Sequence, residues 1–277
     1  MKPVENIHYW RSPDIAGLET CRVIDSKHSF PNHSHESIFA LGIMEQGGAY
    51  CAGYGKEYGF MEQGDIALIN PGQIHSGVPV TDKCITYRML YLEIDLMNRI
   101  ARDIFEDDSL TPEFADLIVR DKTLATLLKL LCSLMTNSQS ILELDSVIFE
   151  TVSTILENYG DRKRKQVEPK REHRAVKQAK EFLSENVEAK ISLEEVSKAV
   201  GLSQYHFLRT FKRATGLSPH VYRTQQRLEK AKQMLKKGIP LAEIALATGF
   251  NDQSHFNNKF RQFTAATPHQ YLSRYSA

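Results

Sequence analysis

The chain has 277 residues, of which 42% are hydrophobic and 25% charged; this is the composition of a globular protein long enough for two domains. No stretch approaches the roughly 20 apolar residues of a membrane span, so a membrane protein is excluded. Four scattered cysteines without a CxxC pair exclude a disulfide framework and a cysteine zinc site, and the net charge of +1 gives no overall bias.

The N-terminal part of the chain is expected to be β-rich. The first ten residues lack the cationic and apolar segments of a secretory signal, so we expect a cytoplasmic protein. Apolar and β-branched runs at 38–44, 66–69 and 85–94 are separated by glycine and proline turns. Many short strands with such turns favour a sandwich or a barrel, which we place at 1–94.

Two motifs in this part are His33-Ser34-His35 and the run from Gly64 to His75. They resemble motifs of the cupin β-barrel family, and the resemblance implies that His33, His35 and His75 converge inside the barrel. Such a set suits Zn, Fe or Ni. The carboxylate that follows HxH in metal cupins is absent, since Glu36 comes too early and points to the opposite face from His35. We therefore predict no metal and no cofactor, and favour a pocket for an organic effector.

Further effector-binding residues are sought among polar and aromatic side chains of the strand region. The candidates are Tyr50, Tyr54, Tyr87, Arg88 and Tyr91. Arg88 is expected to pair with an effector carboxylate. The alternative is that the tyrosines pack between strands and that Arg88 belongs to a surface ion pair. No nucleophile–base pair or paired carboxylates are visible, so we do not expect an enzyme.

Residues 95–159 have helical periodicity. One apolar stripe is followed by a second helix at about 144–157. Such stripes usually pack on their own domain, but the first is rich enough in leucine to predict a homodimer interface. The predicted dimerisation residues are Leu124, Leu127, Leu128, Leu131, Leu134 and Met135.

The segment 160–174 is dense in charge and almost free of apolar side chains, so we expect a linker. Charge also divides the chain at this point. Residues 1–160 hold 12 Lys/Arg against 23 Asp/Glu, whereas residues 161–277 hold 23 against 11. The basic half is suited to a phosphate backbone.

Residues 175–277 are expected to be all helical and contain an internal repeat. Apolar and glycine positions from Leu193 to Leu202 recur 48 residues later, and positions from Phe207 to Tyr222 recur 49 residues later. In the first unit, Ser192 and Glu195 form a capping box, Ser203 caps the second helix, and glycines end both helices. The second unit repeats this with Gly249, Phe250 and Asn251. Each unit is therefore predicted to be a helix-turn-helix.

The second helix of each unit should enter the major groove of DNA. Helical periodicity places phenylalanines inward and polar or cationic residues outward. Arginine, asparagine and glutamine pair with base edges, and later cationic residues suit phosphate. The predicted DNA-binding residues are Ser203, Gln204, Tyr205, His206, Arg209, Lys212, Arg213, Gln253, Ser254, His255, Asn257, Asn258 and Arg261.

The run from Leu241 to Arg261 with Thr267-Pro268, and the run from Ser192 to Pro219, closely resemble the AraC-type family over about residues 173–274. The resemblance implies an effector-responsive transcription regulator that contacts RNA polymerase. Leu208 occupies a position that is often polar in that family, and Asn258 one where arginine occurs. The expected fold is α+β and multidomain: a cupin-like barrel with appended helices, then an all-α domain with two helix-turn-helix motifs. The alternatives are a metal-dependent cupin enzyme with a DNA-binding tail and a constitutive regulator whose barrel only dimerises.

Overall fold

The computed structural model describes residues 7–13, 15–52, 58–80, 83–105, 112–137, 141–160, 171–189 and 191–272. The chain divides into two compact units, one with Met1–Phe30 and Ser34–Lys163 and the other with Arg164–Ser273. Pro31–His33 are counted with the first, because they lie in a strand that is hydrogen bonded into one of its sheets. We call these the sheet unit and the helical unit.

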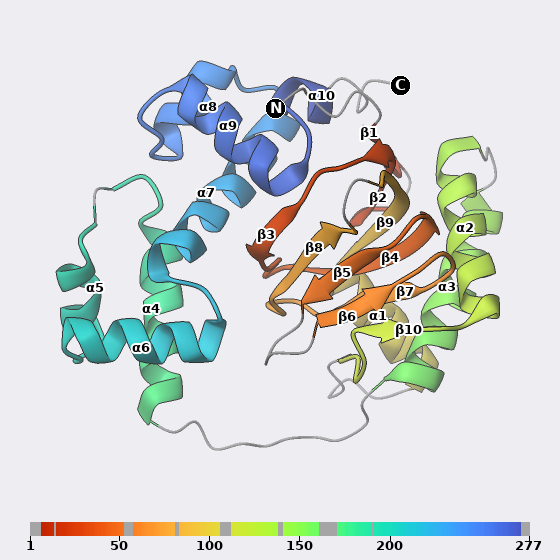
Figure 1. Ribbon diagram of the computed structural model, residues 1–277, viewed down its shortest axis with the longest axis horizontal. Helices are drawn as coiled ribbons and strands as arrows, with labels where there is room; N and C mark the ends of the chain where they lie inside the picture. Colours follow the sequence, from red (N-terminus) through yellow and green to blue (C-terminus); the bar gives the residue numbers. More distant parts are fainter. Residues whose placement is uncertain are drawn as a thin grey trace. The chain divides into compact units, whose positions relative to one another are not determined.

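The sheet unit contains two sheets among the described residues (Figure 1). The larger has the strand order β1-β2-β9-β4-β7-β10 and the smaller the order β3-β8-β5-β6. The strands are β1 Ile7–Arg11, β2 Leu18–Ser26, β3 Phe30–His33, β4 Ile38–Gln46, β5 Ala49–Ala52, β6 Tyr58–Met61, β7 Ile66–Ile69, β8 His75–Pro79, β9 Ile85–Glu93 and β10 Ile118–Val119. The larger sheet is antiparallel throughout, with β4 hydrogen bonded between β9 and β7.

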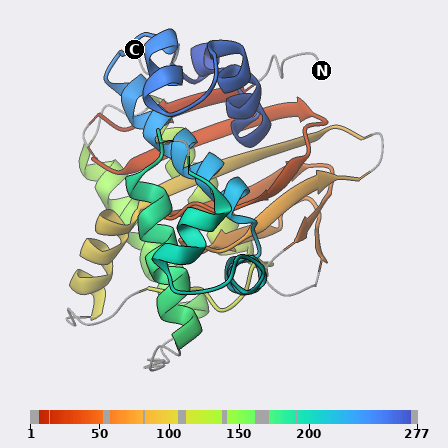
Figure 2. The same ribbon diagram turned by 90° about the vertical axis from the view of Figure 1, so that its left-hand side faces the viewer.

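Three helices cover one face of the larger sheet, α1 Ile94–Phe105, α2 Lys122–Asn137 and α3 Ile141–Tyr159 (Figure 1 and Figure 2). Side chains alternate across a strand. In β4, Phe39 and Leu41 accordingly pack with the helices, while Ala40 and Met44 pack in a second core with residues of β5 and β6. Burial on both faces explains the nearly continuous apolar run in this strand.

The leucine stripe predicted for dimerisation belongs to this core. Leu124, Leu127, Leu128 and Leu131 are buried within the chain, and Leu134 and Met135 pack against the same cluster. A side chain buried by its own sheet cannot also contact a second copy, so the predicted interface is wrong for the four buried leucines. Among the side chains of α2 and α3 that the structure describes, the exposed large apolar ones are Leu130 and Phe149.

An ion-pair group lies on the helix-covered face of the larger sheet. Arg88 and Arg22 both donate to the carboxylate of Glu45, the latter at 2.8 Å. Burial would raise the pKa of Glu45, but the two guanidinium groups outweigh burial and hold the pKa below its usual value. The structure therefore matches the ion-pair alternative for Arg88.

Glu45→Gln is expected to destabilise the sheet unit by about 1–3 kcal/mol, because charge-assisted hydrogen bonds are lost at a largely buried site. A carboxylate with a lowered folded-state pKa stabilises the fold above its unfolded pKa, and this contribution is lost as pH falls through the folded value. Urea unfolding should therefore show a difference between wild type and variant at pH 7 that shrinks below about pH 4.5. Glu62→Gln, in an exposed pair with Arg120, is the control and should cost less than about 1 kcal/mol.

The helical unit contains α4 Arg171–Glu185, α5 Leu193–Ala199, α6 Gln204–Thr215, α7 Pro219–Lys236, α8 Leu241–Ala247, α9 Gln253–Thr264 and α10 Pro268–Leu272. Helix α4 begins inside the segment predicted as a linker over 160–174, of which residues 161–170 lie outside the described part. Its apolar side chains at Ala175, Val176, Ala179 and Leu183 are buried. The predicted division at 94, 159 and 174 stays a prediction.

The helix caps and turn glycines predicted for a helix-turn-helix are present in both repeats. Ser192 and Glu195 form the predicted capping box, and Gly201 has the left-handed conformation expected of the turn. Ser203 caps α6, and Gly216 ends it in the same conformation. In the second repeat the cap of α9 is Asp252, whose carboxylate accepts from the His255 amide, and not Asn251 as predicted. The inserted residue that changes the offset from 48 to 49 moves the cap by one position.

The predicted fold class is confirmed: a β-rich N-terminal unit with appended helices precedes an all-α unit with two helix-turn-helix motifs. Hydrogen bonds do not join the two sheets into a closed barrel within the described residues. Strand β10 lies in the segment predicted as helical.

Candidate functional site

Helices α6 and α9 each bury an aromatic face and expose a polar one. Phe207 and Phe211 of α6, and Phe256 and Phe260 of α9, are almost completely inaccessible. Their rings pack in tilted or edge-on contacts that continue to Tyr222 and Tyr271, which makes the two repeats alike in packing as well as in sequence. The aromatic cores fix both helices and leave the opposite faces to a partner.

The exposed faces carry most of the residues predicted to bind DNA. Ser203, Gln204, His206, Arg209, Lys212 and Arg213 are exposed on or beside α6, and so are Gln253, Ser254 and Asn258 on α9. His255, Asn257 and Arg261 are half-buried, and the side chain of Tyr205 lies outside the described residues. The polar faces of both helices thus provide amide, imidazole and cationic donors.

Helix α7 holds the two repeats in one body (Figure 1). Arg227 donates through Nε to the carbonyl of Val187, 2.7 Å away, and its guanidinium lies over the ring of Phe250. Arg223 donates to the carbonyls of Asn186 and Ala189. The sequence analysis did not predict a role for these two arginines. They lie one helical turn apart on a helix that also buries Leu228, and this pair of cations was the signal that could have identified them.

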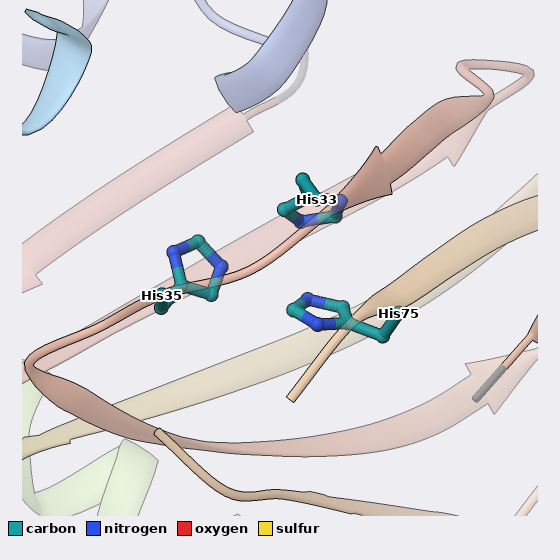
Figure 3. A group of neighbouring side chains, drawn as sticks. All are labelled: His33, His35 and His75. Carbon is teal, nitrogen blue, oxygen red and sulfur yellow. The ribbon is translucent and has the colours of Figure 1, made fainter. Parts of the chain in front are cut away.

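A histidine cluster lies in the sheet unit (Figure 3). We define it as His33, His35 and His75; one ring nitrogen of each lies within 4.8 Å of those of the other two. His33 ends β3 and His75 begins β8, which neighbours β3 in the smaller sheet. The predicted convergence of these residues is therefore confirmed.

Two of the three members of the cluster are buried, and His35 is half-buried. His33 and His75 are buried. Burial and the neighbouring His35 ring lower the pKa of His75 to about 3, although the hydrogen bond to the Gln73 carbonyl acts in the opposite direction. His75 is therefore neutral at physiological pH. The Tyr91 ring lies edge-on to His35, with 6.1 Å between ring centroids.

The structure does not bring every predicted effector residue to the cluster. Tyr87 packs with Tyr91 in the core between the two sheets, and burial raises the pKa of both phenols. Arg88 follows Tyr87 in β9, points to the opposite face and pairs with Glu45. Tyr50 is exposed and packs on Phe60, while Tyr54 lies outside the described residues. Tyr91 lies closest to the cluster by ring contact among these candidates.

Comparison with known families agrees with both halves of this description. Residues 15–152 match the family model described as "AraC-like ligand binding domain", and residues 196–274 match "Helix-turn-helix domain". The chain belongs to the AraC-type family of transcription regulators. It is a DNA-binding regulator with a ligand-binding domain, as the sequence predicted.

Among AraC-type relatives, the uncharacterized HTH-type transcriptional regulator YbfI of Bacillus subtilis is 29% identical over 86% of this chain and 85% of its own length. The multiple antibiotic resistance protein MarA of Escherichia coli is 32% identical over 33% of this chain and 72% of MarA. ToxT from Vibrio cholerae O395 shares the fold with a TM-score of 0.60 and 14% identity, over 95% of this chain and 100% of ToxT.

A structure of ToxT with an unsaturated fatty acid bound has a TM-score of 0.58 and 12% identity, and covers 100% of this chain and 98% of that one. At this identity the likeness concerns the fold alone. Within the described part of the AraC-type chain, no helix is both long and apolar enough to cross a membrane.

Proposed function

We propose that this regulator binds its operator with α6 and α9 in successive major-groove segments of one duplex. The single observation that supports this most is the pair of outward polar faces on two helices that share one packed body through α7. Recognition helices that read successive major-groove segments on one DNA face are about 34 Å apart, one helical turn of the duplex. The cations near the ends of α6 and α9 suit backbone phosphates.

The test is selection of duplexes from a random library with the full-length protein, followed by salt titration. We expect a motif with two contacted segments about 10 base pairs apart and a steep fall of affinity with salt. A motif that one helix can span, or equal affinity for all duplexes, would contradict the proposal.

Arg209→Ala is expected to weaken binding to the selected operator by about 10- to 100-fold, because an arginine that pairs with a guanine edge contributes about 1–3 kcal/mol. Fluorescence anisotropy on the operator and on a scrambled duplex measures this loss of discrimination. Lys83→Ala removes one exposed positive charge from the sheet unit and serves as the matched control. Equal weakening on both duplexes would assign Arg209 to phosphate.

The sheet unit is further proposed to bind a small-molecule effector next to the histidine cluster, with Tyr87 and Tyr91 as neighbours. The family match over residues 15–152 and the fatty acid bound by ToxT support a ligand in this unit. Effector binding changes operator occupancy only through a different affinity for two states of the protein. We also propose a cytoplasmic homodimer that contacts RNA polymerase and has no catalytic activity.

A further inference from the structure

The histidine cluster has the donor set of a transition-metal site. Imidazole nitrogen is a preferred ligand of Zn²⁺, Cu²⁺, Ni²⁺ and Fe²⁺. One ring nitrogen from each of His33, His35 and His75 lies within 4.8 Å of the other two, and Figure 3 shows the three rings around a common space. Three histidines are enough for zinc, since a catalytic-type site keeps its fourth position for water or another ligand. The absence of a carboxylate after the HxH motif therefore does not exclude a metal.

Two of the rings are held in a tautomer that can bind a metal through Nε2. His33 Nδ1–H donates to the Pro31 carbonyl at 2.8 Å, and His75 Nδ1–H donates to the Gln73 carbonyl at 3.0 Å. A carbonyl only accepts, so Nδ1 carries the proton and the lone pair of each ring is on Nε2, the nitrogen through which a ring in this tautomer coordinates a metal. Metal-binding histidines usually make this outer hydrogen bond, which also orients the ring. In both cases the acceptor is the backbone carbonyl two residues before the histidine, so the same local hydrogen bond occurs at both positions.

The backbone that carries the rings is tied together. The Gly72 amide donates to the His35 carbonyl at 2.7 Å, which joins the HxH segment to the turn before His75. Asn70 closes that turn through the Gln73 side chain and reaches the Phe114 carbonyl. Hydrogen bonds within the sheet unit thus hold the three ligands before any ion arrives, as a preorganised site requires.

The remaining geometric step is small. Zn–N bonds of about 2.0–2.1 Å in a tetrahedral site bring ligand nitrogens to about 3.3 Å from one another. The ligand nitrogens lie within 4.8 Å of one another, so their separations have to close by at most about 1.5 Å, which rotations about the side-chain torsions provide. An ion would then connect β3 to β8 through side chains as well as through backbone hydrogen bonds.

We propose that the histidine cluster binds one divalent transition-metal ion of the zinc class through three imidazole nitrogens, with at least one coordination position left open. This goes beyond the expected organic pocket. An anionic effector would be able to occupy the open position; that point rests on the proposed effector site, whereas binding of the ion does not.

The experiment uses the full-length protein, stripped with a chelator and dialysed, without DNA or effector. After Zn²⁺ is added back and the excess is removed, we expect one Zn²⁺ per chain by elemental analysis, and Zn²⁺ should raise the melting temperature because it binds the native state. Added Co²⁺ should give the intense visible absorption of a four- or five-coordinate ion. A weak spectrum typical of a six-coordinate ion, or no stoichiometric binding, would overturn the proposal.

Loss of a hydrogen-bond partner of a metal ligand weakens metal binding by about 10–100-fold. His35→Ala and His75→Ala each remove a ligand itself, so each should weaken Zn²⁺ binding by more than this. His8→Ala, in β1 of the same unit and outside the cluster, is the matched control and should bind as wild type does. Circular dichroism checks folding; if His75→Ala does not fold, His35→Ala decides, since its side chain is less buried. Unchanged Zn²⁺ affinity in a folded His35→Ala variant would reject the cluster as the site. Because no DNA is present, failure here leaves the operator-binding proposal untouched.

Discussion

Leu131→Glu is expected to unfold the sheet unit. Leu131 is 0% exposed and packs in the core between α1–α3 and the larger sheet. Lys129, the cation on the same turn of α2, is exposed on the opposite face and cannot pair with a carboxylate placed there. Burying an unpaired charge or a neutral acid at this position costs at least about 4–5 kcal/mol. That loss is comparable to the whole stability of many domains. Urea unfolding followed by circular dichroism should show the β signal lost at much lower denaturant.

Leu130→Glu is the matched control, since it makes the same change one residue earlier in the same helix. Leu130 is 43% exposed, so the variant should unfold within about 0.5 kcal/mol of wild type. It also tests the proposed homodimer. If α2 and α3 face a second copy, Leu130→Glu or Phe149→Glu should produce folded monomers in analytical ultracentrifugation. A folded Leu131→Glu variant would contradict the assignment of the stripe to the core, and a dimer in all variants would move the interface away from these helices.

The leucine stripe illustrates what sequence periodicity settles and what it leaves open. Spacing of three and four residues correctly places Leu124, Leu128 and Leu131 on one face of one helix. It does not say what covers that face, because a sheet of the same chain and a second copy both bury leucine. Only the long-range contact with the larger sheet decides this, and that contact joins segments about a hundred residues apart.

Arg88 is a different case, because the strand itself carried the missing information. Tyr87 and Arg88 are adjacent in β9, and adjacent residues of a strand point to opposite faces. The two were predicted to share a pocket, which the alternation does not allow. Tyr91 points to the same face of the strand as Tyr87, and its ring contacts His35 of the histidine cluster. The alternation of side chains would therefore have excluded Arg88 from the predicted pocket. That Glu45 is its partner could not be predicted, because it depends on how β4 pairs with β9.

The helix-turn-helix repeats were the most predictable part of the chain. Caps, turn glycines and aromatic faces are local signals, and they require no knowledge of distant contacts. The histidine cluster was predictable from its resemblance to a family motif, but the carbonyl partners of His33 and His75 were not. The role of Arg223 and Arg227 was not predicted either, because the carbonyls that accept their hydrogen bonds lie at the end of α4, some 40 residues earlier.

Gly249→Ala is expected to destabilise the helical unit more than the same change at Gly201. Both glycines end the first helix of a helix-turn-helix with positive φ, +76° and +67°, where a Cβ is disfavoured by about 1–2 kcal/mol. At Gly201 the added Cβ meets nothing within 4 Å. At Gly249 it would lie 2.9 Å from the carbonyl oxygens of Val187 and Glu188 and 2.7 Å from Arg227 Nη2.

The contacts at Gly249 are mostly backbone, so the turn of the second repeat would have to move away from the end of α4. Arg227 donates to the same Val187 carbonyl, and its displacement would also disturb the contact with Phe250. We expect Gly201→Ala to cost about 1–2 kcal/mol and Gly249→Ala about 3–5 kcal/mol, the excess being overpacking. Thermal unfolding of both variants measures the difference, and operator affinity should fall further for Gly249→Ala because α9 shifts relative to α6. Equal losses at the two glycines would mean that the two repeats do not meet at this turn, and that α7 alone sets the spacing of the recognition helices.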